Sequence, residues 1–101
     1  MNDKLLSLLG IARRAGRLSL GFDPAADTMK KGRTNLLLLA ADLSGNSRKS
    51  VLQEAERTNT KSIVLDRTMA ELGAAVGKNV GIIAVNDRGF ADSIEKMIHN
   101  T

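Results

Sequence analysis

Hydrophobic positions along the chain alternate between two patterns. Apolar residues at three- and four-residue spacing predict amphipathic helices, and short runs without polar interruption predict strands buried on both faces. The predicted helices run from Asp3 to near Gly16, from Asp23 to about Lys31, from a cap at Ser44–Ser47 to about Thr58, from Thr68 to Ala75, and from Asp87 to Ile98. The predicted extended segments are Leu18–Leu20, Leu36–Ala41, Ser62–Leu65 and Gly81–Val85.

Local signals support these boundaries. Asp23 followed by Pro24 is a favourable N-cap and first-turn pair, and Thr68 and Asp87 can cap the two later helices. Gly32 and Gly77 are suitable residues for ending the helices before them.

Buried strands that alternate with helices indicate an α/β protein. We predict a three-layer α/β/α sandwich around a small central mixed sheet of about four strands. No linker, repeat or low-complexity stretch divides the chain, so residues 1–101 are expected to form a single domain.

Composition narrows the class of protein. The chain has 101 residues and no cysteine, which excludes disulfides and thiolate chemistry and suits a reducing cytoplasm. The apolar run Leu36–Ala41 is far shorter than the ~20 residues of a membrane span, so we expect a cytoplasmic protein without a membrane partner. Phe22 and Phe90 are its only aromatic residues, too few for the stacking platforms of single-strand binders.

Charge is distributed unevenly between the two halves of the chain. Nine of the 15 Lys and Arg residues lie in positions 1–50 against four Asp, a net charge of 9 − 4 = +5. The remaining positions hold six basic and seven acidic residues, a net charge of −1. A one-sided cationic field is typical of a protein that binds a polyanion, although a solvated face that maintains solubility is the alternative.

Catalytic chemistry finds little support. His99 is the only histidine and lies near the end of the chain, and Glu54 and Glu56 point apart on a helix. The glycines match neither the phosphate-loop spacing nor the dinucleotide fingerprint. We therefore expect neither an enzyme nor a cofactor or metal site.

A binding site is better supported at Gly21. This glycine precedes a helix whose first N–H groups are free to bond a phosphate or a base edge. Lys30 and Lys31 follow about two turns later. Arg48 and Lys49, expected in the first turn of the third helix, oppose its dipole, so they either bind a phosphate or are simply solvated.

Six segments of the chain together form a characteristic pattern: Leu8–Leu18, Gly21-Phe22-Asp23, Lys31-Gly32, Ala40-Ala41-Asp42, Glu71–Gly77 and Ile82–Val85. This pattern resembles the L-seven-Ae superfamily of ribosomal and kink-turn-binding proteins, and especially its small bacterial YlxQ-like members. The resemblance covers about Leu5 to Ile98.

The resemblance implies binding of structured RNA at one edge of the sandwich. The family's recognition stretch reads Gly-x-Asn-Glu-x-x-Lys and is followed by Arg-Gly. Here Gly21 matches, while Asp23, Pro24 and Asp27 replace the Asn, Glu and Lys. Ionised Asp23 can only accept hydrogen bonds, whereas Asn both donates and accepts. The candidate RNA-binding residues are Arg13, Arg14, Arg17, Gly21, Phe22, Asp23, Asp27, Lys30, Lys31, Lys78, Asn79 and Val80.

We therefore predict a non-enzymatic RNA-binding protein without a cofactor. Its expected partner is structured RNA, either ribosomal or kink-turn-containing, with the ribosome or another protein as a further partner. The basic half is expected to supply affinity, and the glycine turn and the loop at Lys78 are expected to supply shape. The alternative is a protein-interaction module on the same fold, for which the acidic Asp23 and Asp27 are the evidence.

Overall fold

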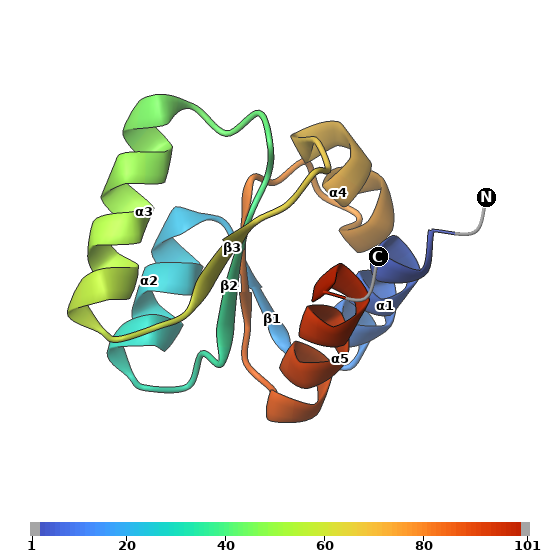
Figure 1. The fold of residues 1–101 in the computed structure, drawn as a ribbon, viewed down its shortest axis with the longest axis horizontal. Helices are drawn as coiled ribbons and strands as arrows, with labels where there is room; N and C mark the ends of the chain where they lie inside the picture. The colour runs from blue at the N-terminus through green and yellow to red at the C-terminus, as the bar shows by residue number, and fades with distance from the viewer. Residues whose placement is uncertain (1–2, 100–101) are drawn as a thin grey trace.

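The computed structural model describes residues 3–99, which form five helices and four strands in strict alternation (Figure 1). The elements are α1 (Lys4–Arg14), β1 (Leu18–Leu20), α2 (Phe22–Lys30), β2 (Leu36–Leu39), α3 (Gly45–Arg57), β3 (Ser62–Val64), α4 (Met69–Val76), β4 (Ile82–Val85) and α5 (Arg88–His99). Each predicted helix and strand is present, with boundaries shifted by a few residues.

The four strands form one mixed sheet in the order β1-β4-β2-β3. β4 runs antiparallel to both of its neighbours, and β2 runs parallel to β3. The carboxyl ends of β1, β2 and β3 therefore meet at the same edge of the sheet, together with the start of β4. This arrangement confirms the predicted small mixed sheet.

Helices cover both faces of the sheet, with α1, α4 and α5 on one side and α2 and α3 on the other (Figure 1). The four leucines of β2 alternate between the two resulting cores. Leu36 and Leu38 belong to the cluster on the α1 side, and Leu37 and Leu39 belong to the cluster on the α2 side. A strand buried on both faces has no polar alternation, which explains the uninterrupted leucine run.

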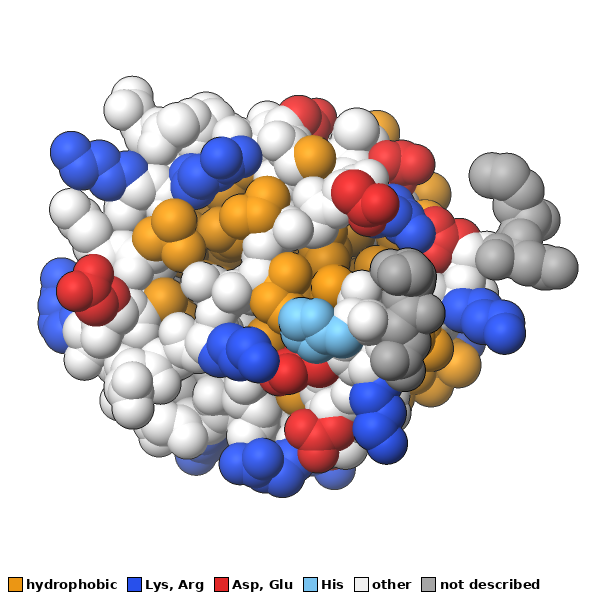
Figure 2. All heavy atoms as spheres, viewed as in Figure 1, with side chains coloured by type: hydrophobic (Ala, Val, Ile, Leu, Met, Phe, Trp, Pro, Cys, Tyr) orange, Lys and Arg blue, Asp and Glu red, His pale blue; other side chains and the backbone are white. Residues whose placement is uncertain are grey.

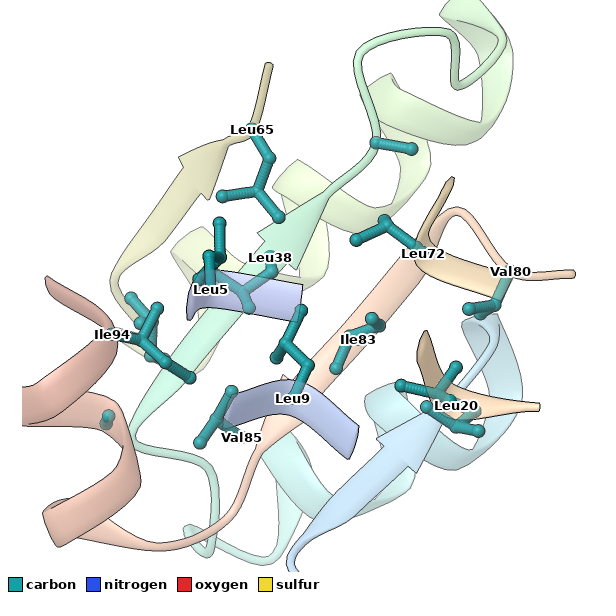
Figure 3. Close-up of a cluster of buried hydrophobic side chains, with 14 residues drawn as sticks. Leu5, Leu9, Leu20, Leu38, Leu65, Leu72, Val80, Ile83, Val85 and Ile94 are labelled. Carbon is teal, nitrogen blue, oxygen red and sulfur yellow. The ribbon is translucent and has the colours of Figure 1, made fainter. Parts of the chain in front are cut away.

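The larger core lies under α1, α4 and α5. Figure 3 shows Leu9 of α1 above Ile83 and Val85 of β4, with Leu72 of α4 and Ile94 of α5 contributing from either side. Each of these side chains is fully or almost fully buried. This packing holds β4, the central strand of the antiparallel part, rigidly in place.

Strand β3 differs from its prediction as a buried strand. Ser62 and Val64 are exposed, Val64 by 49%, and Ile63 is only half-buried. The strand pairs with β2 alone and forms one edge of the sheet, so one of its faces lacks the helical cover that β2 and β4 have. Its hydrophobic pattern reflects half-burial at an edge.

Most of the predicted caps are confirmed. Thr68 and Glu71 form a reciprocal capping box at the start of α4, and Gly77 ends that helix in the left-handed conformation with φ 82°. Asp87 Oδ1 accepts a hydrogen bond from the Phe90 N–H at the start of α5. None of the helices described between residues 3 and 99 combines the length and apolarity needed to cross a bilayer.

Candidate nucleic-acid interface

The turn after β1 and the loop before β4 lie side by side at one edge of the sheet. The Gly21 N–H donates to the Ile82 carbonyl at 2.9 Å, and the Ala40 N–H donates to the Gly81 carbonyl at 2.9 Å. These backbone bonds place the start of α2 next to the loop 77–81. We call this edge the glycine-turn end and define it by Gly21, Phe22, Asp23 and the loop residues Lys78 and Asn79.

Gly21 has a backbone conformation that other residues rarely adopt. Its φ is 93° and its ψ is 171°, a region essentially restricted to glycine. A Cβ atom built at this position would meet no atom within 4 Å. The backbone of the turn is therefore open to a partner on the side from which a side chain would project.

Helix α2 begins without a side-chain cap. Gly21 is its N-cap residue, whereas the other four helices each have a side-chain oxygen that accepts a hydrogen bond from their first turn. The predicted N-cap, Asp23, is wrong: it lies within the first turn, because the chain enters the helix at Gly21 as soon as β1 ends. The N–H groups of Phe22 and Asp23 thus have no acceptor within the helix.

Three side chains on α2 determine what the glycine-turn end offers. Phe22, one of only two aromatic residues in the chain, is 38% exposed, so its ring is available to a partner. Asp23 and Asp27 are also exposed and lie one helical turn apart. Asp27 pairs with Lys31 at 3.0 Å, which reduces the net negative charge along this face of the helix.

The loop before β4 supplies the other half of this end. Lys78 and Asn79 are exposed, as their predicted role requires. Val80 is only 3% exposed and packs into the larger core, so its side chain does not contribute to the surface predicted for it. It anchors the loop from below, because the loop must re-enter the core just before Ile82.

Gly73 shapes this loop and was missed as a contributor to the site. A Cβ at Gly73 would lie 2.9 Å from the Cα of Asn79 and 3.2 Å from the Lys78 carbonyl oxygen. Only a residue without a side chain lets the loop fold back this closely on α4. The four-residue spacing between Gly73 and Gly77 is the only signal in the sequence that bears on this contact, and it does not identify Asn79 as the partner.

An ion pair braces the same end of the molecule from the other layer. Asp3 Oδ2 accepts a hydrogen bond from Arg67 Nε at 2.8 Å, and Asp3 Oδ1 also accepts one from the Leu6 N–H at 3.1 Å. The Arg67 guanidinium and this N–H hold the pKa of Asp3 below its ordinary value, and the hydrogen bond that Arg67 donates to Asp3 raises the pKa of Arg67. The pair ties the start of α1 to the segment between β3 and α4.

A second group of charged residues lies at the opposite edge of the sheet, where α1 and α2 end and α5 begins. We call it the basic end, and its members are Arg13, Arg14, Arg17, Lys30, Lys31, Arg33 and Arg88. All seven are exposed, and Lys and Arg side chains are visible along the lower edge of the molecule in Figure 2. Arg17 pairs with Asp87 at 3.7 Å and Lys31 with Asp27, while the other five form no ion pair among residues 3–99.

The structure therefore separates residues that were predicted to act together. Arg13, Arg14 and Arg17 precede β1, whereas Gly21 follows it, so the strand lies between them. Lys30 and Lys31 lie at the end of α2 that is remote from Gly21, roughly 13 Å away at 1.5 Å per residue over nine residues. The predicted set divides into a backbone turn at one end and a cationic surface at the other.

Arg48 and Lys49 begin the second turn of α3, because the helix starts earlier than expected, at Gly45. The Nη2 atom of Arg48 donates to the Ala41 carbonyl at 3.3 Å, so this side chain braces the loop after β2. Within residues 3–99, no cluster of three or more His, Asp or Glu side chains could hold a metal ion.

Comparisons with known proteins agree with this architecture. The family described as ribosomal protein L7Ae/L30e/S12e/Gadd45 matches residues 3–95. The RNA-binding protein YlxQ of Bacillus subtilis is 30% identical over 92 residues, which cover 90% of this chain and 91% of that protein.

Solved structures share the same fold. A protein of unknown function from Bacillus halodurans C superposes with a TM-score of 0.89 at 29% identity, over 97% of this chain and 99% of that one. The 15.5 kD RNA-binding protein of Giardia lamblia superposes with a TM-score of 0.77 at 14% identity, over 99% of this chain and 89% of that one.

Proposed function

The chain belongs to the ribosomal protein L7Ae/L30e/S12e/Gadd45 family, and we propose that it is a non-enzymatic protein that binds structured, kink-turn-like RNA at its glycine-turn end. The resemblance to the L-seven-Ae superfamily noted in the sequence and the name of the Bacillus subtilis relative both support this proposal. One structural observation carries it: α2 begins at an uncapped Gly21 whose backbone is open to a partner.

The chemistry at this turn suits a phosphate or a base edge. Two free N–H groups, at Phe22 and Asp23, point out of the helix N-terminus, where the helix dipole favours an anion. The exposed ring of Phe22 offers a surface for an unstacked base. Lys78 and Asn79 add a cation and a two-way hydrogen-bonding group from the adjacent loop.

We further propose that Asp23 and Asp27 reduce the affinity of this site for RNA. Both carboxylates are exposed next to the turn, and an ionised carboxylate only accepts hydrogen bonds and repels a phosphate. The site therefore relies on backbone donors more than on side-chain charge. It should recognise the shape of a kinked RNA and tolerate variation in sequence.

Two substitutions at the turn test this proposal. Gly21→Ala and Gly21→Val each force a residue with a Cβ into this conformation, at a cost of about 1–3 kcal/mol of stability that is larger for the β-branched valine. Only the branched valine extends far into the space beside the free N–H groups. We expect kink-turn affinity to fall for both variants, and further for valine by about 3 kcal/mol as two charge-assisted hydrogen bonds are lost.

A matched control is available within the chain. Gly16 also has a positive φ, 72°, and a Cβ there would meet no atom within 4 Å, but it lies at the opposite edge of the sheet. Gly16→Val should therefore lower the melting temperature without lowering kink-turn affinity. A folded Gly21→Val variant with wild-type affinity in a fluorescence anisotropy titration would remove the glycine turn from the binding site.

A further inference from the structure

The basic end lies at the opposite edge of the sheet from the glycine-turn site, and we propose that it is a second RNA-binding surface, which holds the phosphate backbone of a separate RNA duplex without reading its sequence. The protein would then join two RNA segments, one at each end of its sheet. Three features of the basic end support this second surface: its unpaired charges, the hydrogen bonds that hold its chain segments together, and its separation from Gly21.

Unpaired positive charges gather at the basic end. Arg13, Arg14, Lys30, Arg33 and Arg88 are exposed and form no ion pair among the described residues. Neighbouring positive charges repel one another. Binding to a phosphate backbone relieves that repulsion and releases the counterions condensed on the nucleic acid. Three different loops or helix ends contribute these side chains, so local sequence does not account for their gathering.

Hydrogen bonds hold together the chain segments that carry these charges. Asn86 lies between the three chain segments that carry the charges. Its N–H donates to the Arg17 carbonyl at 2.8 Å, its Nδ2 donates to Ser19 Oγ at 2.8 Å, and its Oδ1 accepts from Thr34 Oγ1 at 3.0 Å. These bonds fix the α1–β1, α2–β2 and β4–α5 connections relative to one another, so the arginines project from a preorganised base.

The types of side chain at the basic end indicate which kind of partner it fits. Five of the seven basic residues are arginine, whose planar guanidinium matches phosphate oxygens in a bidentate geometry. The sequence contains no Trp or Tyr, Phe22 lies at the other end of the sheet, and Phe90 in the first turn of α5 is partly buried against the larger core, so there is no stacking platform for single-stranded bases. A duplex, which presents regularly spaced phosphates and stacked bases, fits this surface better than a single strand.

The test compares two triple variants that remove the same charge. One is Arg13→Ala, Arg14→Ala and Arg33→Ala at the basic end. The control is Lys4→Ala, Lys49→Ala and Lys96→Ala, which removes three exposed, unpaired cations elsewhere on the molecule. None of the six side chains makes an ion pair or a side-chain hydrogen bond in the described structure, so both variants should fold, and a thermal melt checks this.

The probe is a blunt RNA duplex of mixed sequence, titrated at several salt concentrations. The basic-end variant should lose roughly tenfold or more in affinity at low salt, and its log–log salt slope should shrink by about one for each arginine removed. The control should change affinity less than about threefold. Equal losses in the two variants, or no loss in either, would show that the basic end is not a binding surface.

Two further measurements separate this inference from the proposed function. Gly21→Val should leave duplex binding unchanged, and the basic-end variant should leave kink-turn affinity at moderate salt within about threefold of wild type. If Gly21→Val keeps full kink-turn affinity while the duplex results hold, the proposed function fails and the second surface stands. Wild-type binding to polyglutamate as tight as to the duplex would overturn the assignment of RNA as the partner.

Joining is tested directly by capture. A biotinylated duplex on streptavidin should retain a fluorescent kink-turn RNA only when wild-type protein is present. Either Gly21→Val or the basic-end variant should reduce that retention to background, since each removes one of the two contacts. Retention by both variants at the wild-type level would contradict the two-surface arrangement.

Discussion

The two ends of the sheet offer a partner different things. The glycine-turn end presents backbone donors, one exposed aromatic ring and a loop folded tightly against Gly73. The basic end presents long cationic side chains on connections that Asn86 holds together. Backbone groups in fixed positions discriminate shape, whereas charged side chains supply affinity that depends on salt. The net charge of +4 therefore does not reveal by itself where a partner binds, because the fold determines which charged side chains lie together.

The largest effect is expected from reversing the acidic character of α2. The double change Asp23→Asn with Asp27→Lys restores a two-way hydrogen-bonding group beside the turn and replaces a repulsive charge with an attractive one. Kink-turn affinity should rise by about 1–3 kcal/mol. Duplex affinity should rise less, because the change lies on α2 and leaves the arginines of the basic end in place. A folded double variant without any gain on kink-turn RNA would favour a protein partner at this end.

Gly73→Ala should damage the glycine-turn end alone. Its Cβ would approach the Asn79 Cα to 2.9 Å, so the loop must move, at a cost of about 1–3 kcal/mol that the better helix propensity of alanine offsets by about 1 kcal/mol. Chemical denaturation and kink-turn titration measure the two consequences. Ala74→Gly, at an exposed position of the same helix, is the control: it lowers stability without lowering affinity.

Asn86→Ala should loosen the basic end. It removes the hydrogen bonds to Ser19 and Thr34, each worth about 1 kcal/mol of stability. Duplex affinity should fall severalfold, because the arginines lose their shared base, while kink-turn affinity should remain. If duplex binding stays at the wild-type level in a destabilised variant, the arginines do not depend on this network.

The smallest effect concerns pH and the brace at the glycine-turn end. The lowered pKa of Asp3 means that its ion pair with Arg67 stabilises the fold above about pH 4, and that this contribution is lost as the pH falls through the lowered pKa. Asp3→Asn keeps an N-cap for α1 but loses the charge, so it should cost about 0.2–1 kcal/mol at pH 7. Thermal melts from pH 7 to about pH 2 should show the two proteins converging at the acid end, and a constant difference would contradict this account.

Much of the fold could be predicted because its signals are local. Ser44, Thr68 and Asp87 cap helices as expected, and the leucines of β2 lack alternation because both faces are buried. The edge position of β3 could not be predicted, because a short apolar segment has the same sequence pattern whether or not a helix covers it. Asp23 was misplaced because the Asp-Pro signal is local, whereas the helix start is determined by where β1 stops pairing with β4.

The candidate site was harder to predict than the fold, because its geometry is a property of the sheet. Gly21 was identified by its position before a helix N-terminus and the loop at Lys78 through the family resemblance, and the structure places them side by side. Arg17 and Gly21 are only four positions apart, yet a strand runs between them and carries them to opposite edges. The role of Gly73 depends on a contact with Asn79 that the sequence alone does not reveal.

The strand order has a consequence for how the chain folds during synthesis. β4 is the last strand to leave the ribosome, yet it pairs with both β1 and β2, and β1 has no other partner in the sheet. Until residues 82–85 emerge, β1 cannot join a sheet, and the leucines of β2 lack a neighbour on one side. Exposed apolar strands of this kind aggregate readily. We therefore expect a nascent chain halted before Ile82 to be held by chaperones and to become protease-resistant only once β4 is free to insert.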